Sequence, residues 1–112
     1  MRPMTISEKI LARDADVDQL LPDDLTDVIV YMALANDITA PLAIKVFKEI
    51  GTHSVFDPEK IALIPDHFVP NKDIESAEQA RVMREFAIQH QIKYYYEIGQ
   101  SGIEHVILPD LA

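Results

Sequence analysis

The sequence has 112 residues, 48% of them hydrophobic, a length and apolar content that suit one globular domain over residues 1–112. Its 19 acidic residues against 10 basic ones leave a net charge of −9, which opposes binding to nucleic acid or to an anionic membrane, so a small molecule or another protein is the expected partner. It has no cysteine, which excludes disulfides and any thiolate metal site built by this chain alone.

The first predicted elements are a short helix and a buried strand. The capping box Thr5–Glu8 predicts a helix start, and five aspartates between Asp14 and Asp24 indicate a surface connection. The nearly unbroken apolar run from Val28 to Leu34 is typical of a strand covered on both faces, and such strands are usually parallel. No apolar run is long enough to span a membrane and no export signal follows Met1, so we expect a cytoplasmic protein.

Two helices and two more strands are predicted after this strand. Thr39 is expected to cap a helix that Gly51 ends, and a second buried strand is expected over Lys60–Ile64. The capping box Ser76–Gln79 predicts the next helix, and Ile92–Ile98 predicts a third strand. The residues expected on the buried faces of the two helices are Leu42, Ala43, Val46, Phe47 and Ile50 in the first and Val82, Met83, Phe86 and Ala87 in the second.

This order of elements indicates the fold class. Strand, helix, strand, helix and strand in succession give two right-handed crossovers between parallel strands. We therefore expect a three-layer α/β/α fold with a mainly parallel sheet.

Polar residues follow the end of each predicted strand. Ligands of open parallel sheets bind beyond the carboxyl ends of the strands, so we expect these residues to share one edge. A histidine beside a carboxylate suits general acid–base chemistry, because imidazole titrates near ~6.5 and a carboxylate can orient its charged form. The residues concerned are Asn36-Asp37, Asp66-His67, and Gly99–Gly102 with His105.

Each candidate also has a structural interpretation. His67 fits a loop histidine beside a turn-capping Asp66 as well as it fits a site. Ser101 and Glu104 form a possible capping box whose helix start offers N–H groups to an anion, and His105 could lie at a site or be buried against the sheet. Asn36 and Thr39 could contact substrate, but turn formation and helix capping explain them too.

Four segments together resemble the start of 3-isopropylmalate dehydratase large subunits and of the related homoaconitases, in the aconitase family. The similarity runs in register from Met4 to Pro109. Val106 departs from the glutamine of many relatives, which leaves the substrate open between 3-isopropylmalate and a homocitrate-type acid. The segments are Met4–Ala12, Ala35–Ile44, Pro65–Asp73 and Gly102–Pro109.

The resemblance implies an activity and a set of site residues. It implies a hydro-lyase of leucine or lysine biosynthesis that uses a [4Fe-4S] cluster to isomerise a hydroxy di- or tricarboxylate by removing and re-adding water. His67, paired with Asp66, would protonate the departing hydroxyl, and His105 would be a second catalytic residue. Asn36, Thr39 and Ser101 are the candidate substrate-binding residues.

The resemblance also implies what this chain lacks. The family continues through three cluster cysteines and works with a separate small subunit, so the chain would be an N-terminal fragment of the first aconitase domain, inactive alone and binding no cluster. Apolar surface left uncovered could make it a homo-oligomer.

Two other functions stay open. One is a free-standing, non-catalytic module of the same descent that binds a small carboxylate or assembles with a partner. The other is a metal-independent hydrolase or lyase built on Asp66 and His67, which no nucleophile or oxyanion hole in the sequence supports.

Overall fold

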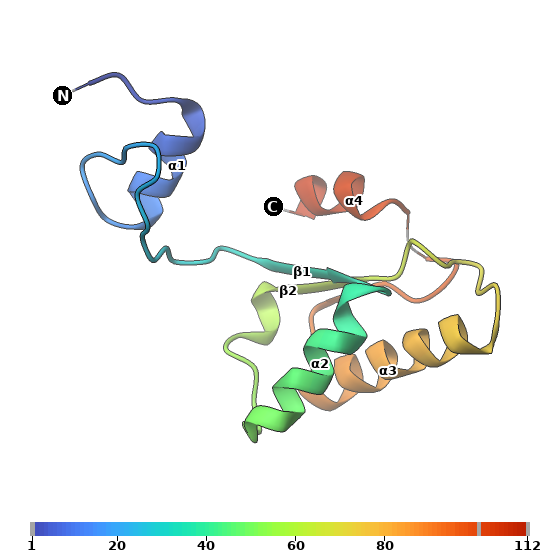
Figure 1. The fold of residues 1–112 in the computed structure, drawn as a ribbon. Coiled ribbons are helices and arrows are strands. Elements are labelled where there is room, and N and C mark those ends of the chain that lie inside the picture. The colour runs from blue at the N-terminus through green and yellow to red at the C-terminus, as the bar shows by residue number, and fades with distance from the viewer. Residues whose placement is uncertain (1, 101, 112) are drawn as a thin grey trace. The chain divides into compact units, whose positions relative to one another are not determined.

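A computed structural model describes residues 2–100 and 102–111 of the chain (Figure 1). The chain divides into two compact units, Met1–Tyr31 and Met32–Ala112. Among the described helices, none combines the length and the apolar character that crossing a membrane requires.

The first unit contains one helix, α1 (Ile6–Asp14). The predicted capping box is confirmed: the Glu8 N–H donates to Thr5 Oγ1 at 3.2 Å, and the Thr5 N–H donates to Glu8 Oε2 at 2.7 Å. Residues 15–24 form turns and irregular backbone, as the aspartates between Asp14 and Asp24 predicted, and the irregular backbone continues to residue 31. Asp16 and Asp23 adopt positive φ angles of 55° and 70°, which aspartate tolerates better than most residues.

The first predicted strand is wrong at its beginning. The strand β1 covers Ala33–Asn36, and the apolar residues before it are exposed, with Ile29 at 77%. Ala33 pairs with Ile61, the first residue of β2, and among the described residues the pairing of the two strands begins there. The apolar run that predicted this strand therefore begins several residues before the strand itself.

The second unit is built on a parallel sheet with the strand order β1-β2-β3. The central strand β2 (Ile61–Ile64) is buried along its whole length, as predicted, and pairs with β1 up to the partners Asn36 and Ile64. The third strand is shorter than predicted, because β3 (Tyr94–Tyr95) pairs only with Ala62 and Leu63 of β2. Ile92 is instead buried in the core just before it.

Helices cover the sheet on both sides. In Figure 1, α2 (Thr39–Ile50) and α3 (Ile74–His90) lie on one side of the strands and α4 (Glu104–Leu111) lies on the other. Two successive right-handed crossovers place α2 and α3 on the same side. The predicted α/β fold with a parallel sheet is confirmed, and a 3₁₀ turn, η1 (Pro58–Lys60), precedes β2.

The core lies between the sheet and these two helices. The predicted buried face of α3 is confirmed for Met83, Phe86 and Ala87. The prediction for α2 is wrong for most of its residues, since Leu42 and Ile50 are 66% and 72% exposed. The prediction is confirmed for Phe47, which packs against the core together with the unpredicted Ala40 and Ile44, at the spacing i, i+4, i+7. The helix carries more apolar residues than one face needs, so periodicity could not select the correct stripe.

The start of α3 also differs from its prediction. Asp73, not Ser76, caps this helix, because the Ser76 N–H donates to Asp73 Oδ1 at 2.8 Å. Ser76 Oγ in turn accepts the Asp73 N–H at 3.2 Å, which completes a capping box three residues earlier than expected.

We predict that Ile64→Ala lowers the free energy of unfolding by about 2–5 kcal/mol, because it opens a cavity at a fully buried position of the central strand. Ile50→Ala makes the same chemical change at an exposed position of α2 and should shift it by less than about 0.5 kcal/mol. Urea unfolding followed by circular dichroism measures both. Equal losses for the two variants would contradict the assignment of the core.

Candidate functional site

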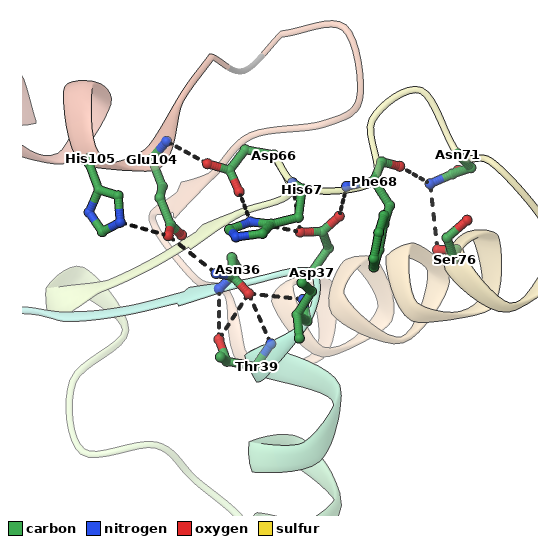
Figure 2. A network of polar contacts seen from close by, with 11 residues as sticks. Asn36, Asp37, Thr39, Asp66, His67, Phe68, Asn71, Ser76, Glu104 and His105 are labelled. Atoms are coloured by element: carbon green, nitrogen blue, oxygen red, sulfur yellow. Dashed lines mark hydrogen bonds and ion pairs between the residues drawn. The ribbon is translucent and has the colours of Figure 1, made fainter.

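Three segments that are distant in sequence meet at the carboxyl edge of the sheet (Figure 2). Asn36 is the last residue of β1, Asp66 and His67 follow β2 after Pro65, and Glu104 is the first residue of α4. Their side chains form one polar network, whose contacts are drawn in Figure 2. The fold thus brings together Asn36, Asp66 and His67, which the sequence assigned to one sheet edge, and adds Glu104 to them.

Asp66 and His67 form the closest pair in this network. Asp66 Oδ1 lies 2.5 Å from His67 Nδ1, and Asp66 Oδ2 accepts the Glu104 N–H at 2.8 Å. One carboxylate therefore orients the imidazole and also satisfies a free N–H group at the start of α4. The His67 side chain is 43% exposed, and its Nε2 has no partner among the described residues.

The surroundings of His67 favour its protonated form. The hydrogen bond that the His67 ring donates to Asp66 raises the pKa of His67, and burial opposes this more weakly. The negative charges of Asp66, Asp37 and Glu104 raise the pKa further. An imidazolium with Nδ1 held by a carboxylate can donate the proton on Nε2, as a general acid must.

Asp37 is a member of this network that the sequence did not assign a role. Its side chain is 2% exposed, and its two oxygens accept the backbone N–H groups of His67 at 3.0 Å and Phe68 at 2.7 Å. Asp37 Oδ1 also lies 3.8 Å from His67 Nδ1. The sequence showed only that an acidic residue follows the first strand, and the contact itself spans 30 positions.

Asn36 and Thr39 are engaged with each other and with the start of α2. Asn36 Oδ1 accepts the N–H groups of Ile38 and Thr39, both at 2.9 Å. The prediction that Thr39 caps α2 is therefore wrong, because Asn36 supplies the capping oxygen and Thr39 is already helical. Thr39 Oγ1 donates to Asn36 Oδ1 at 3.2 Å.

Glu104 is the second carboxylate that the sequence did not assign to the site. Asn36 Nδ2 donates to Glu104 Oε1 at 3.2 Å, whereas Glu104 Oε2 is buried with no partner among the described residues. Its only sequence signal was the possible capping box with Ser101, and Ser101 lies outside the described residues. The structure shows that Asp66 accepts the N–H that begins this helix.

His105 lies at the border of the network. Its side chain is 82% exposed, so the interpretation as a histidine buried against the sheet is wrong. His105 Nε2 lies 3.3 Å from Glu104 Oε1. The contact points the ring toward the network, and most of its surface is open to solvent.

The donor atoms at this edge do not fit an iron–sulfur cluster. Asp37, Asp66 and His67 could each offer one ligand atom within 4.8 Å of the others, but these are oxygens and a nitrogen. Clusters are held mainly by thiolates, and the sequence contains no cysteine. Both oxygens of Asp37 already accept backbone N–H groups. Such a site suits holding a proton better than holding a metal.

A separate apolar pocket lies on the α2 side of the sheet. It has a volume of about 210 Å³ and is lined by residues that include Ala33, Ala35, Phe47 and Phe56. None of its lining residues belongs to the polar network or carries a charge. It therefore offers nothing that would bind a carboxylate.

Fold and site together define an α/β protein whose parallel sheet presents a carboxylate–histidine pair at its carboxyl edge. No family model matches the chain. The chain is 54% identical over 107 residues to the 3-isopropylmalate dehydratase large subunit of Thermodesulfovibrio yellowstonii, covering 96% of this chain and 25% of that protein. Large subunits of the same name match at 53% identity in Syntrophus aciditrophicus and 54% in Aquifex aeolicus, again over 96% of this chain and over 26% and 24% of those proteins.

The resemblance to 3-isopropylmalate dehydratase large subunits is thereby confirmed, and this chain is related to them over nearly all of its residues. The chain spans about a quarter of the length of the curated relatives it matches.

We predict that Asp66→Asn lowers the pKa of His67, because it replaces the charged hydrogen-bond acceptor that most favours the imidazolium with a neutral amide. Because the pKa of His67 is higher in the folded than in the unfolded protein, protonation of His67 stabilises the fold at a pH below about 6.5, the pKa in the unfolded protein. This stabilisation is lost as the pH rises through the pKa of the folded protein. Asp66→Asn should therefore lower the free energy of unfolding most at pH 6 and less at pH 9. NMR titration of the ring protons measures the pKa. An unchanged pKa of His67 would show that the pair does not form in solution.

Proposed function

We propose that this chain supplies the general acid of a hydro-lyase that removes and re-adds water on a hydroxy dicarboxylate. The observation that carries the proposal is His67, whose Nδ1 is held by Asp66 while Nε2 is left for a substrate. The names of the relatives support this reaction class and favour 3-isopropylmalate over a homocitrate-type substrate.

The chemistry follows from the ring geometry. Hydroxide is a poor leaving group, so dehydration needs a proton delivered to the departing oxygen, and the Nε2–H of a protonated His67 can deliver it. The same dehydration breaks a C–H bond on the neighbouring carbon, and we propose that a base of the small subunit takes that proton. The neutral ring of His67 is then ready to accept a proton from water when the alkene is rehydrated on the other side. Asp66 accepts the hydrogen bond from Nδ1, holds the ring and stabilises its positive charge.

His105 is proposed as the second acid–base residue, because its exposed ring lies beside Glu104 at the border of the network. For Asn36 and Thr39, the hydrogen bonds they already make would have to be exchanged if they contact substrate. Ser101 is retained as a substrate-binding candidate because its sequence position predicts a helix start close to a strand end, which would offer N–H groups to an anion.

The site also indicates what must come from elsewhere. Asp37, Asp66 and Glu104 place three carboxylates around His67, and no lysine or arginine belongs to the described network. This arrangement repels the carboxylates of a hydroxy acid instead of binding them. We therefore propose that the cationic groups and the thiolates of a [4Fe-4S] cluster belong to other parts of a full-length large subunit and to a small subunit, and that this chain alone is inactive.

The test uses a chimera in which the matched residues of the Thermodesulfovibrio yellowstonii large subunit are replaced by those of this chain, assembled with its small subunit. His67→Asn keeps the approximate size of the ring but removes the titratable proton, so kcat should fall by about 10² to 10⁴ while KM changes little. Steady-state kinetics with 3-isopropylmalate measures both constants, with cluster content determined in parallel.

His53→Asn is the matched control, because His53 is exposed and outside the polar network, and it should leave kcat unchanged. If the chimera is active and His67→Asn retains most of its kcat at equal cluster content, His67 is not the acid. That result would favour the non-catalytic module over the proposed function.

A further inference from the structure

Asp37 does not serve the helix that follows it. The capping oxygen of α2 comes from Asn36, which leaves the neighbouring carboxylate of Asp37 free to point to another segment. Figure 2 shows Asp37 directed at the loop after β2. There its two oxygens accept two successive backbone N–H groups, those of His67 and Phe68.

The buried carboxylate of Asp37 must be stabilised by its contacts. Removing a charge from water is costly unless hydrogen bonds compensate for it, and here two charge-assisted bonds of 3.0 Å and 2.7 Å do so. An amide at position 37 could accept only one of the two N–H groups and would turn a donor toward the other. Only an ionised acid of this length satisfies both, so the contact is specific for aspartate.

We propose that Asp37 is a positioning residue for His67, whose buried carboxylate fixes the backbone of His67 and Phe68 and thereby sets where the imidazole lies. The Asp66 side chain holds the ring by Nδ1, but Asp66 belongs to the same loop and moves with it. Asp37 is anchored at the end of β1, so it ties this loop to a strand of the sheet. Two restraints, one on the ring and one on the backbone, define the direction of Nε2.

The charge of Asp37 acts on the same residue. The groups that face His67 are Asp66 from its own loop, Asp37 from the end of β1 and Glu104 from the start of α4, and all three are acidic. Removing any one of them should make the imidazolium less favourable. The pKa of His67 therefore distinguishes the proposed role of Asp37 from a purely structural role, which would leave this pKa unchanged.

The first experiment uses this 112-residue chain and needs no catalytic activity. Asp37→Asn should lower the pKa of His67 and accelerate amide exchange of His67 and Phe68 by about tenfold or more, as expected for a lost charge-assisted hydrogen bond. Asp57→Asn is the matched control, since Asp57 also accepts one backbone N–H, that of Glu59, outside the network. A folded Asp37→Asn variant with both quantities unchanged would overturn the proposal.

The wild-type chain provides a measurement that does not depend on the variant folding. On acidification, the amide protons of His67 and Phe68 should shift with the same midpoint as the side-chain carboxyl carbon of Asp37. Different midpoints would show that these N–H groups are not bound by that carboxylate.

The second experiment rests on the proposed function and uses the active chimera. Asp37→Asn should lower kcat by up to about 10²-fold with little change in KM, because a misplaced acid loses transition-state contact and leaves substrate binding intact. If His67→Asn leaves kcat unchanged, the proposed function fails and the NMR results still decide the role of Asp37. If His67→Asn abolishes turnover while Asp37→Asn changes neither kcat nor the NMR observables, only the positioning role fails.

Discussion

The parallel pairing of β1 with β2 determines where Asn36, Asp37, Asp66 and His67 lie relative to one another. The two strands run in register to their last partners, Asn36 and Ile64, so both chains leave the sheet at the same edge. Asp37 and His67 are therefore neighbours although they are 30 positions apart in sequence. A shift of one residue in this register would turn alternate side chains to the other face and separate the carboxylate from the loop it binds.

The electrostatic character of the site follows from which groups this edge collects. Three acidic side chains face one imidazole, and two of them, Asp37 and Glu104, are almost wholly buried. Backbone N–H groups compensate for the charges of Asp37 and Asp66, which lets carboxylates persist close to one another. The outcome is a histidine whose protonated form is favoured, at an edge where no lysine or arginine belongs to the described network.

Sequence patterns predicted the central elements and failed at the margins, for physical reasons. β2 was predicted correctly because its short apolar run is bounded and covered on both faces. Val28–Val30 and Leu42 are equally apolar but exposed, so hydrophobicity alone could not distinguish them from core residues. The place of Asp66 and His67 at the sheet edge could be predicted, because they directly follow a predicted strand. The contacts of Asp37 and Glu104 join residues that are far apart in sequence, and no local pattern encodes such contacts.

The most direct test of this account is the tautomer of His67, which ¹⁵N chemical shifts of the imidazole report at a pH above its pKa. The 2.5 Å contact with Asp66 requires the proton of the neutral ring to remain on Nδ1, with Nε2 unprotonated and open to a substrate. We predict this Nδ1–H tautomer in the 112-residue chain and its loss in the unfolded protein. A neutral ring protonated mainly on Nε2, as in free histidine, would contradict it.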